Sequence, residues 1–155
     1  MRTPRLQLVP LTIETGRAVL AGDLSRLETA EGWPRADTID AIRAAVSHGP
    51  RSLVWLVMLD GVVIGDCGTV GPMRAGGEIE IGYGLAAEHR GRGDGTEVVA
   101  ALSSWLRSRP GVSRVVAEVP FANAPASSKS ARRTIGCGTH WRLWTAAQVT
   151  VQAGG

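Results

Sequence analysis

Residues 80–97 read E-I-G-Y-G-L-A-A-E-H-R-G-R-G-D-G-T-E, and the fold and the function are both inferred outward from this stretch. A β-rich run ends at Leu85, and Gly91, Gly93 and Gly95 follow in a loop that also carries arginines. A helical pattern starts directly after the loop. Glycine lets a backbone approach a ligand closely, and the free N–H groups at a helix start favour an anion. The stretch therefore predicts a site for phosphate groups.

The spacing of the glycines in this loop distinguishes it from the common nucleotide-binding motifs. A P-loop requires G-x-x-x-x-G-K-[ST], and the stretch contains no lysine. A dinucleotide fingerprint requires G-x-G-x-x-G, whereas the spacing here is G-x-G-x-G. Three glycines so close together also suit a plain tight turn. The pattern that fits is R-x-x-G-x-G, formed by Arg90, Gly93 and Gly95.

Together with I-G-Y at residues 81–83, this pattern resembles the acetyl-CoA loop of the GNAT superfamily of N-acetyltransferases. T-P-R-L-Q-L-V-P-L-T at residues 3–12 and I-G-D-C-G-T-V-G-P at residues 64–72 resemble its RimJ/RimL-like, ribosomal-protein-acetylating branch. The resemblance runs over about residues 3–144. It implies one α/β acetyltransferase domain over residues 1–155, built on a mixed, mostly antiparallel twisted sheet. The sheet would have roughly six to seven strands, splayed between the fourth and fifth, with about four flanking helices.

Bulk composition fits an ordinary globular protein and argues against several other classes. The 155 residues are 44% hydrophobic and 20% charged, which suits one domain with a proper core. A net charge of +3, scattered along the chain, is too small to indicate nucleic-acid binding. The two cysteines lack metal-site spacing, so no metal is expected. No long apolar segment or signal core is present, so we expect no membrane association and a cytoplasmic location.

Periodicity and turn residues predict the remaining elements. Strands are expected at residues 5–10, 52–59, 62–70, 78–85 and 112–119, with a last hairpin from 140–145 and 149–152. Helices are expected from Thr12 to about Ala21, from Asp37 or Thr38 to His48, from Gly95 to Arg107, and from Ser128 to Ile135. The second to fourth strands form an antiparallel meander through an Asp60-Gly61 hairpin. The strand at 112–119 should be parallel to that at 78–85, since a helix connects them.

The resemblance implies how coenzyme A is held. Backbone N–H groups of the loop would cradle its pyrophosphate, with the two arginines adding charge, over the set Arg90, Gly91, Arg92, Gly93, Asp94, Gly95 and Thr96. Asp94 departs from the family pattern, which has an apolar residue there, and we expect its carboxylate to turn toward solvent. Pantetheine would bind along Gly84, Leu85 and Ala86, whose backbone would also polarise the thioester carbonyl. The alternatives are a solvated loop face for the arginines and a plain strand end for the other three.

A carboxylate on the strand before the loop is the candidate base. Glu78 and Glu80 point to the same face of that strand because side chains alternate. Glu80, next to I-G-Y, is preferred, and Glu78 stays an alternative, as does a purely solvent-facing role. His89 and His140 are rivals on chemistry alone, since neither lies in a matching motif.

The candidate acid is less well marked. The family often uses a tyrosine after the fifth strand, and the single tyrosine of this chain, Tyr83, lies elsewhere. The RimJ/RimL-like branch instead carries N-x-x-S, which Asn123 matches as a cofactor-binding residue. Ser128 is the preferred acid, with Ser127 an alternative and helix capping the plain explanation. Basic side chains further on would meet the 3′-phosphate or face water, namely Lys129, Arg132 and Arg133.

These features predict an enzyme that moves an acetyl group from acetyl-CoA to a primary amine by direct attack. The acceptor would be a protein N-terminus, an amino acid or a small amine such as an aminoglycoside. Polar and aromatic residues between the first two helices would form its rim, namely Glu31, Trp33, Arg35 and Asp37. The alternative function is a non-catalytic CoA-binding or interaction module of the same fold. A homodimer is the assembly that the resemblance implies.

Overall fold

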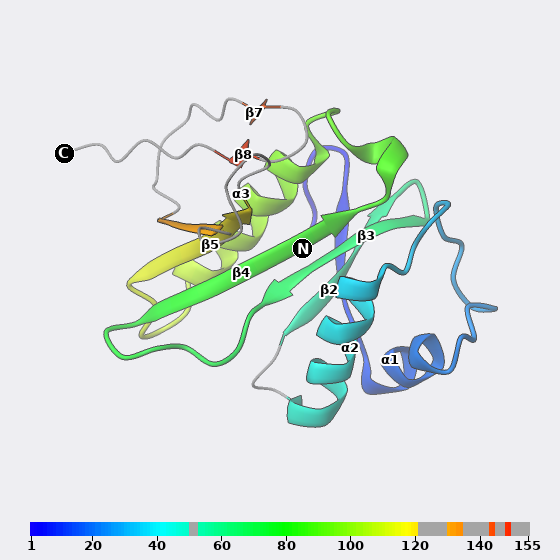
Figure 1. Cartoon of the computed structure of the whole chain (residues 1–155), viewed down its shortest axis with the longest axis horizontal. Coiled ribbons are helices and arrows are strands. Elements are labelled where there is room, and N and C mark those ends of the chain that lie inside the picture. The colour runs from blue at the N-terminus through cyan, green and yellow to red at the C-terminus, as the bar shows by residue number, and fades with distance from the viewer. Residues whose placement is uncertain (50–52, 121–129, 135–142, 145–147, 150–155) are drawn as a thin grey trace.

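A six-stranded sheet in the order β1-β2-β3-β4-β5-β6 forms the centre of the molecule (Figure 1). The computed structural model describes residues 1–49, 53–120, 130–134, 143–144 and 148–149. The strands are β1 (Gln7–Pro10), β2 (Val54–Leu59), β3 (Val62–Thr69), β4 (Glu78–Leu85), β5 (Arg114–Pro120) and β6 (Ser130–Thr134). The mixed α/β fold expected from the sequence is confirmed.

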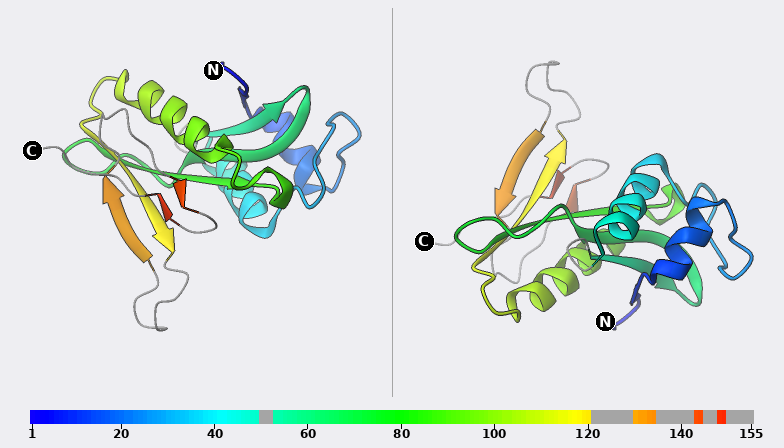
Figure 2. Two further views of the ribbon diagram at one scale, coloured as in Figure 1. Left: turned by 90° about the horizontal axis from the view of Figure 1, so that it is seen from above. Right: turned by 90° about the horizontal axis from the view of Figure 1, so that it is seen from below.

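Helices cover both faces of this sheet (Figure 2). Helix α3 (Asp94–Arg107) lies on one face, and α1 (Ile13–Leu20) and α2 (Ala36–His48) lie on the other. Two apolar clusters correspond to these two faces. The α3 cluster includes Val98, Leu102 and Leu106, and the α1–α2 cluster includes Val19 and Ile42. The apolar spacing of each helix therefore sets the face that it buries.

The predicted meander is confirmed, since β2, β3 and β4 pair antiparallel in chain order. The β2–β3 turn has Asp60 at φ 50° and Gly61 at φ 88°. Positive φ at both central residues is the backbone of a tight hairpin whose twist matches that of the strands.

Strand β5 pairs with β4 in parallel, as the crossover helix predicts, but only over part of their length. Glu78–Ile81 pair with Arg114–Ala117. From there β4 continues to Leu85, paired only with β3 on its other side. Figure 2 shows β5 and β6 turning away from the plane of the other strands. This separation is the splay implied by the family resemblance.

The helix predicted over 128–135 is wrong across residues 130–134, which form strand β6. This strand pairs antiparallel with β5, from Val116 opposite Thr134 to Pro120 opposite Ser130. A helix of two turns gains little stability on its own. Pairing instead satisfies the backbone N–H and C=O groups along the free edge of β5.

Helix termini agree with the sequence only in part. Thr12 caps α1 as predicted, and its hydroxyl accepts from the backbone N–H of Thr15 at 3.0 Å. The predicted cap of α2 is wrong, since Arg35 is the N-cap and Asp37 and Thr38 lie in the first turn. The Thr38 hydroxyl is directed instead to the sheet, where it donates to Asp66.

Beyond β6 the described residues form one short antiparallel pair, β7 (Leu143–Trp144) with β8 (Gln148–Val149), which overlaps the predicted last hairpin in part. A one-turn 3₁₀ helix, η2 (Ala87–His89), joins β4 to the loop before α3. Among the described residues, no helix has the length and apolar character needed to cross a membrane.

Candidate functional site

The glycine-arginine loop ends at a helix start that no side chain caps. Gly91 and Gly93 adopt φ values of 72° and 87°, which glycine accepts far more readily than other residues. Gly93 is the N-cap of α3 and, having no side chain, makes no capping hydrogen bond to the first turn. Arg90 and Arg92 are both exposed beside it. Open N–H groups, the positive end of the helix dipole and two nearby guanidinium groups suit an anion.

Two contacts fasten this loop to the end of β4. The Nε of Arg90 donates to the backbone oxygen of Leu85 at 3.1 Å. A Cβ atom at Gly95 would lie 2.9 Å from the ring of Tyr83. Packing against Tyr83 therefore favours glycine at position 95, and Thr96 follows it, half-buried, in the first turn of α3.

The side chain of Asp94 points inward, so the expectation that it turns toward solvent is wrong. Its side chain is only 1% exposed. Arg5 lies 2.8 Å from its Oδ1, and the Nδ1 of His89 lies 3.7 Å from its Oδ2. A buried carboxylate is tolerated when a cation compensates its charge. The sequence could not show this compensation, because Arg5 is distant in the chain.

The same arginine joins the N-terminal segment to α3. Arg5 Nε and its backbone N–H both donate to Glu97 at 2.9 Å, and the Thr3 hydroxyl also bonds to Glu97. Partial burial acts to raise the pKa of Glu97, but the bonds from Thr3 and Arg5 outweigh burial and lower it. One terminal guanidinium nitrogen of Arg5 also donates to the backbone oxygen of Arg92 at 3.4 Å. The N-terminal segment thus supports the helix start from behind.

The last residues of β4 present different edges to their two neighbours. The backbone oxygen of Glu80 accepts from the N–H of Val70, and the N–H of Ala86 donates to the backbone oxygen of Ile64. The even-numbered residues of this stretch therefore direct their backbone groups to β3. Because the direction alternates along a strand, Tyr83 and Leu85 direct their backbone groups to the β5 side. No pairing with β5 is described beyond Ile81. The open edge that an added extended ligand could use therefore lies at Tyr83 and Leu85, and Ala86 N–H is already engaged.

Glu80, the base expected from the sequence, lies in a network of ion pairs. Arg74 contacts Glu80 at 2.8 Å and Glu78 at 3.1 Å, and Arg114 also pairs with Glu78. Both carboxylates are buried, Glu80 at 8% and Glu78 at 9% exposure. Glu80 is four residues from Gly84, which is about 13 Å along a strand.

A cavity of about 220 Å³, with two carboxylates in its lining, lies between α2 and the ends of β3 and β4. Asp37, Asp66, Gly82 and Gly84 are among the residues that line it. Asp66 is directly opposite Gly84 in the β3–β4 register. This carboxylate was not singled out from the sequence, although an aspartate inside an otherwise apolar strand is a signal that could have found it.

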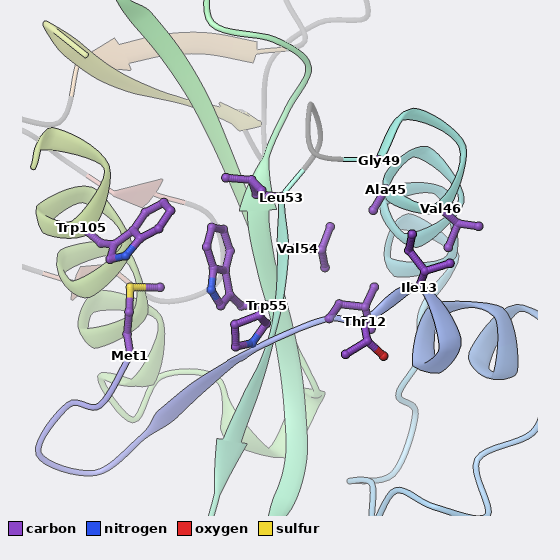
Figure 3. A pocket seen from close by; sticks show the side chains of 12 residues that line it. Met1, Thr12, Ile13, Ala45, Val46, Gly49, Leu53, Val54, Trp55 and Trp105 are labelled. Atoms are coloured by element: carbon purple, nitrogen blue, oxygen red, sulfur yellow. The ribbon is translucent and has the colours of Figure 1, made fainter. Parts of the chain in front are cut away.

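A larger cavity, of about 500 Å³, lies elsewhere and is apolar. Figure 3 shows Met1, Trp55 and Trp105 on one side of it and Ile13 and Val46 on the other. Its one side-chain hydroxyl, that of Thr12, already caps α1. No acidic or basic side chain is among the described residues that line it, so the smaller cavity, which contains Asp37 and Asp66, is the better candidate for reaction.

Several site residues expected from the sequence lie outside the described part of the chain, namely Asn123, Ser127, Ser128, Lys129 and His140. Arg132 and Arg133 lie on β6, and only their backbone is described. Among the described residues, no cluster of three or more His, Cys, Asp or Glu side chains could hold a metal ion.

Comparison with known proteins gives a match to one family over most of the chain. The profile of the acetyltransferase (GNAT) domain matches residues 5–134. The uncharacterized N-acetyltransferase YjdG of Bacillus subtilis (strain 168) is 29% identical, over 62% of this chain and 62% of its own length. The chain therefore spans less than two thirds of that relative.

Solved structures share the fold at low sequence identity. RimL, a ribosomal L7/L12 alpha-N-protein acetyltransferase solved in complex with coenzyme A, has a TM-score of 0.56 and 16% identity, covering 78% of this chain and 74% of its own. A dodecameric spermidine N-acetyltransferase from Vibrio cholerae has a TM-score of 0.53 and 14% identity, covering 77% and 72%. At these identities the likeness concerns the fold.

The pairing of Arg5 with Asp94 predicts a measurable coupling. Arg5→Ala leaves a buried carboxylate without its main cation, so the free energy of unfolding should fall by about 1–3 kcal/mol in urea. Asp94→Asn should recover part of that loss in the double variant. Arg26→Ala is the matched control, since Arg26 pairs with Glu14 at the same 2.8 Å but with both side chains exposed, and it should have almost no effect. Additive single effects would contradict the coupling.

The lowered pKa of Glu97 predicts an acid-sensitive contribution to stability. A carboxylate whose pKa is lower in the folded state stabilises the fold above its ordinary pKa, and the stabilisation is lost as pH falls through the lowered value. Wild-type protein should therefore lose stability below about pH 4.5 more steeply than Glu97→Gln, as followed by urea unfolding at each pH. Parallel pH curves for the two proteins would refute this.

Proposed function

Because this chain belongs to the acetyltransferase (GNAT) domain family, we propose that it transfers an acetyl group from acetyl-CoA to a primary amine. The observation that carries the proposal is the uncapped start of α3 beside the unpaired end of β4. The start of α3 suits the diphosphate of coenzyme A, and the unpaired end of β4 suits its extended pantetheine arm. The two features adjoin, as a single ligand with both parts requires.

The loop would hold the diphosphate through backbone N–H groups at Gly93, Asp94, Gly95 and Thr96. The exposed side chains of Arg90 and Arg92 would add positive charge. The carboxylate of Asp94 points away into its pair with Arg5, so it does not oppose a bound phosphate directly. These observations support the loop assignment made from the sequence.

The pantetheine arm would add to the open edge of β4. Leu85 N–H and the backbone of Tyr83 face the splay, so they are the groups best placed for it among residues 83–86. Donors aimed at the thioester oxygen would stabilise negative charge as the carbonyl carbon becomes tetrahedral. Gly84 would leave space for the acceptor on the opposite face of the strand.

The proposed reaction is direct attack by a neutral amine. The nitrogen lone pair forms a bond to the thioester carbonyl carbon, and the carbon–sulfur bond breaks with its electron pair on sulfur. An ammonium acceptor releases one proton before attack, and a second proton passes from nitrogen to the thiolate. The products are an acetamide and the free thiol of coenzyme A, with one proton released to solvent.

The acceptor class is part of the proposal. The named relatives act on a protein N-terminus and on spermidine, which are both amines, and the fold alone does not choose between them. A cytoplasmic location, where acetyl-CoA is made, and a homodimer are proposed with it. Light scattering of the purified protein measures the assembly.

Gly93→Val tests the loop assignment. A β-branched side chain at φ 87° strains the turn that presents the backbone N–H groups, and its Cβ atom would lie 3.5 Å from a terminal nitrogen of Arg5, so affinity for coenzyme A should fall by at least about 100-fold. Gly61→Val is the matched control, because Gly61 has φ 88° in the β2–β3 hairpin, distant in sequence from the loop. Urea unfolding should show a similar loss of stability in both variants, whereas calorimetric titration with coenzyme A should show a loss of affinity only in Gly93→Val. Unchanged affinity in Gly93→Val would remove the loop as the cofactor site.

Glu80 as the base stays a prediction with its own test. On that hypothesis Glu80→Gln lowers kcat more than it lowers affinity for coenzyme A, since only the proton transfer is affected. The acceptor panel should contain a short peptide with a free N-terminus, an amino acid, spermidine and an aminoglycoside. Turnover equal to wild type would exclude Glu80 as the base. Tight binding of acetyl-CoA by the wild type, with no product from any amine, would favour the non-catalytic module.

A further inference from the structure

Asp66 differs from every other buried carboxylate described in this chain. The other buried carboxylates are Glu78, Glu80 and Asp94. Glu78, Glu80 and Asp94 each have an arginine within 3.1 Å. In the described part of the chain, no ion pair involves Asp66, whose hydrogen-bond donors there are neutral.

Those donors fix one oxygen of the carboxylate. Trp33 Nε1 donates to Oδ1 at 3.2 Å, and Thr38 Oγ1 donates to the same atom at 2.5 Å. Both bonds therefore hold the group in one orientation, and neither donor carries a charge that would offset its own. Burying an uncompensated carboxylate is costly, and such a group in a cavity is a candidate for a functional role.

The position of Asp66 relative to β4 points to the reaction. It lies opposite Gly84, and a Cβ atom at Gly84 would be 3.9 Å from both Asp66 Oδ1 and Asp37 Oδ2. The absence of a side chain at Gly84 thus leaves a space that two carboxylates flank. This space adjoins Leu85, where the thioester would bind under the proposed function. Glu80 lies four residues before Gly84 on β4 and is paired with Arg74.

Resting on the proposed acetyl transfer, we propose that Asp66 is the proton acceptor for the incoming amine, and that Asp37 favours acceptors that are cationic in water. The Asp66 carboxylate takes one proton from the ammonium group over Gly84 and becomes a neutral carboxylic acid. The freed lone pair then attacks the thioester carbon. Asp66 returns its proton to solvent after the product leaves, so the residue is regenerated.

The surroundings of Asp66 suit this task. Burial raises its pKa, against the hydrogen bonds from Thr38 and Trp33, and nearby Asp37 raises it further while Arg35 opposes this. A base whose pKa is nearer to neutrality is a better proton acceptor at neutral pH. Tyr83 also lines the cavity, and burial raises the pKa of its phenol, so that group stays neutral.

Because the pKa of Asp66 is raised, the stability of an Asp66 variant can separate a catalytic role of this residue from a structural one. A carboxylate whose pKa is higher in the folded state costs stability as pH rises above its ordinary value. Asp66→Asn removes that cost and keeps an oxygen that accepts from Trp33 and Thr38. The variant should therefore unfold at the same urea concentration as wild type at pH 7, or at a higher one, and should bind coenzyme A with unchanged affinity.

The decisive experiment compares two small amines that differ in charge. Ethylamine is protonated at pH 7, whereas 2,2,2-trifluoroethylamine is largely neutral. Asp66→Asn should lower kcat for ethylamine by about 100-fold or more and should affect trifluoroethylamine much less. Asp37→Asn should raise KM for ethylamine by about tenfold with little change in kcat. Asp66→Asn should also cost more turnover than Glu80→Gln.

Each result bears on one hypothesis. Wild-type kcat for ethylamine in Asp66→Asn, or an equal loss for both amines, would overturn the role of Asp66. Failure of the wild type to bind acetyl-CoA would instead refute the proposed function. If neither small amine is turned over, the pH profile of the best acceptor in the panel makes the same decision, since the variant's rate should rise with pH up to the pKa of the amine. A variant profile with the shape of the wild-type profile would overturn the assignment.

Discussion

The early end of the β4–β5 pairing is the constraint on which the rest of this site depends. Four residues of β4 are paired with β5, and the strands then separate while β4 remains held by β3. A strand interior normally has both edges satisfied, so an edge left open beside a helix start is unusual. It creates room for an extended ligand on the α3 side and brings the α2 side within reach of the same residues. Both halves of the proposed chemistry follow from that one opening.

Charge compensation differs between the two sides of the opening. At the start of α3, where we propose that the diphosphate binds, Arg5 pairs with both Asp94 and Glu97. The acidic first turn of α3 would therefore not repel a phosphate ligand. At the acceptor side, Asp66 has only neutral donors, while Glu78 and Glu80 are neutralised by arginines. Among the buried carboxylates that the structure describes, an arginine therefore pairs with each one except Asp66, to which we assign the proton transfer.

Local signals in the sequence were sufficient for much of the fold. The bounds of β4 were predicted correctly, and α3 starts only one residue before the predicted position. Both predictions rest on local signals, namely alternation, glycine turns and an apolar stripe. The burial of Asp94 and the surroundings of Asp66 could not be predicted in this way, since their partners Arg5 and Thr38 meet them only in the folded chain. Strand β6 was missed because its stability comes from the edge of β5 rather than from its own residues. The loop was recognised by its composition alone, whereas the cavity beside Asp66 depends on tertiary contacts.

A crystal structure of the protein with coenzyme A tests the central claim most directly. The account expects the diphosphate against the backbone N–H groups at Gly93–Thr96 and the pantetheine arm along the open edge of β4 at Tyr83 and Leu85. The arm should lead its sulfur atom toward the side of Gly84 that faces Asp66. Phosphates bound away from the start of α3, or a pantetheine arm that avoids the splay between β4 and β5, would contradict the account.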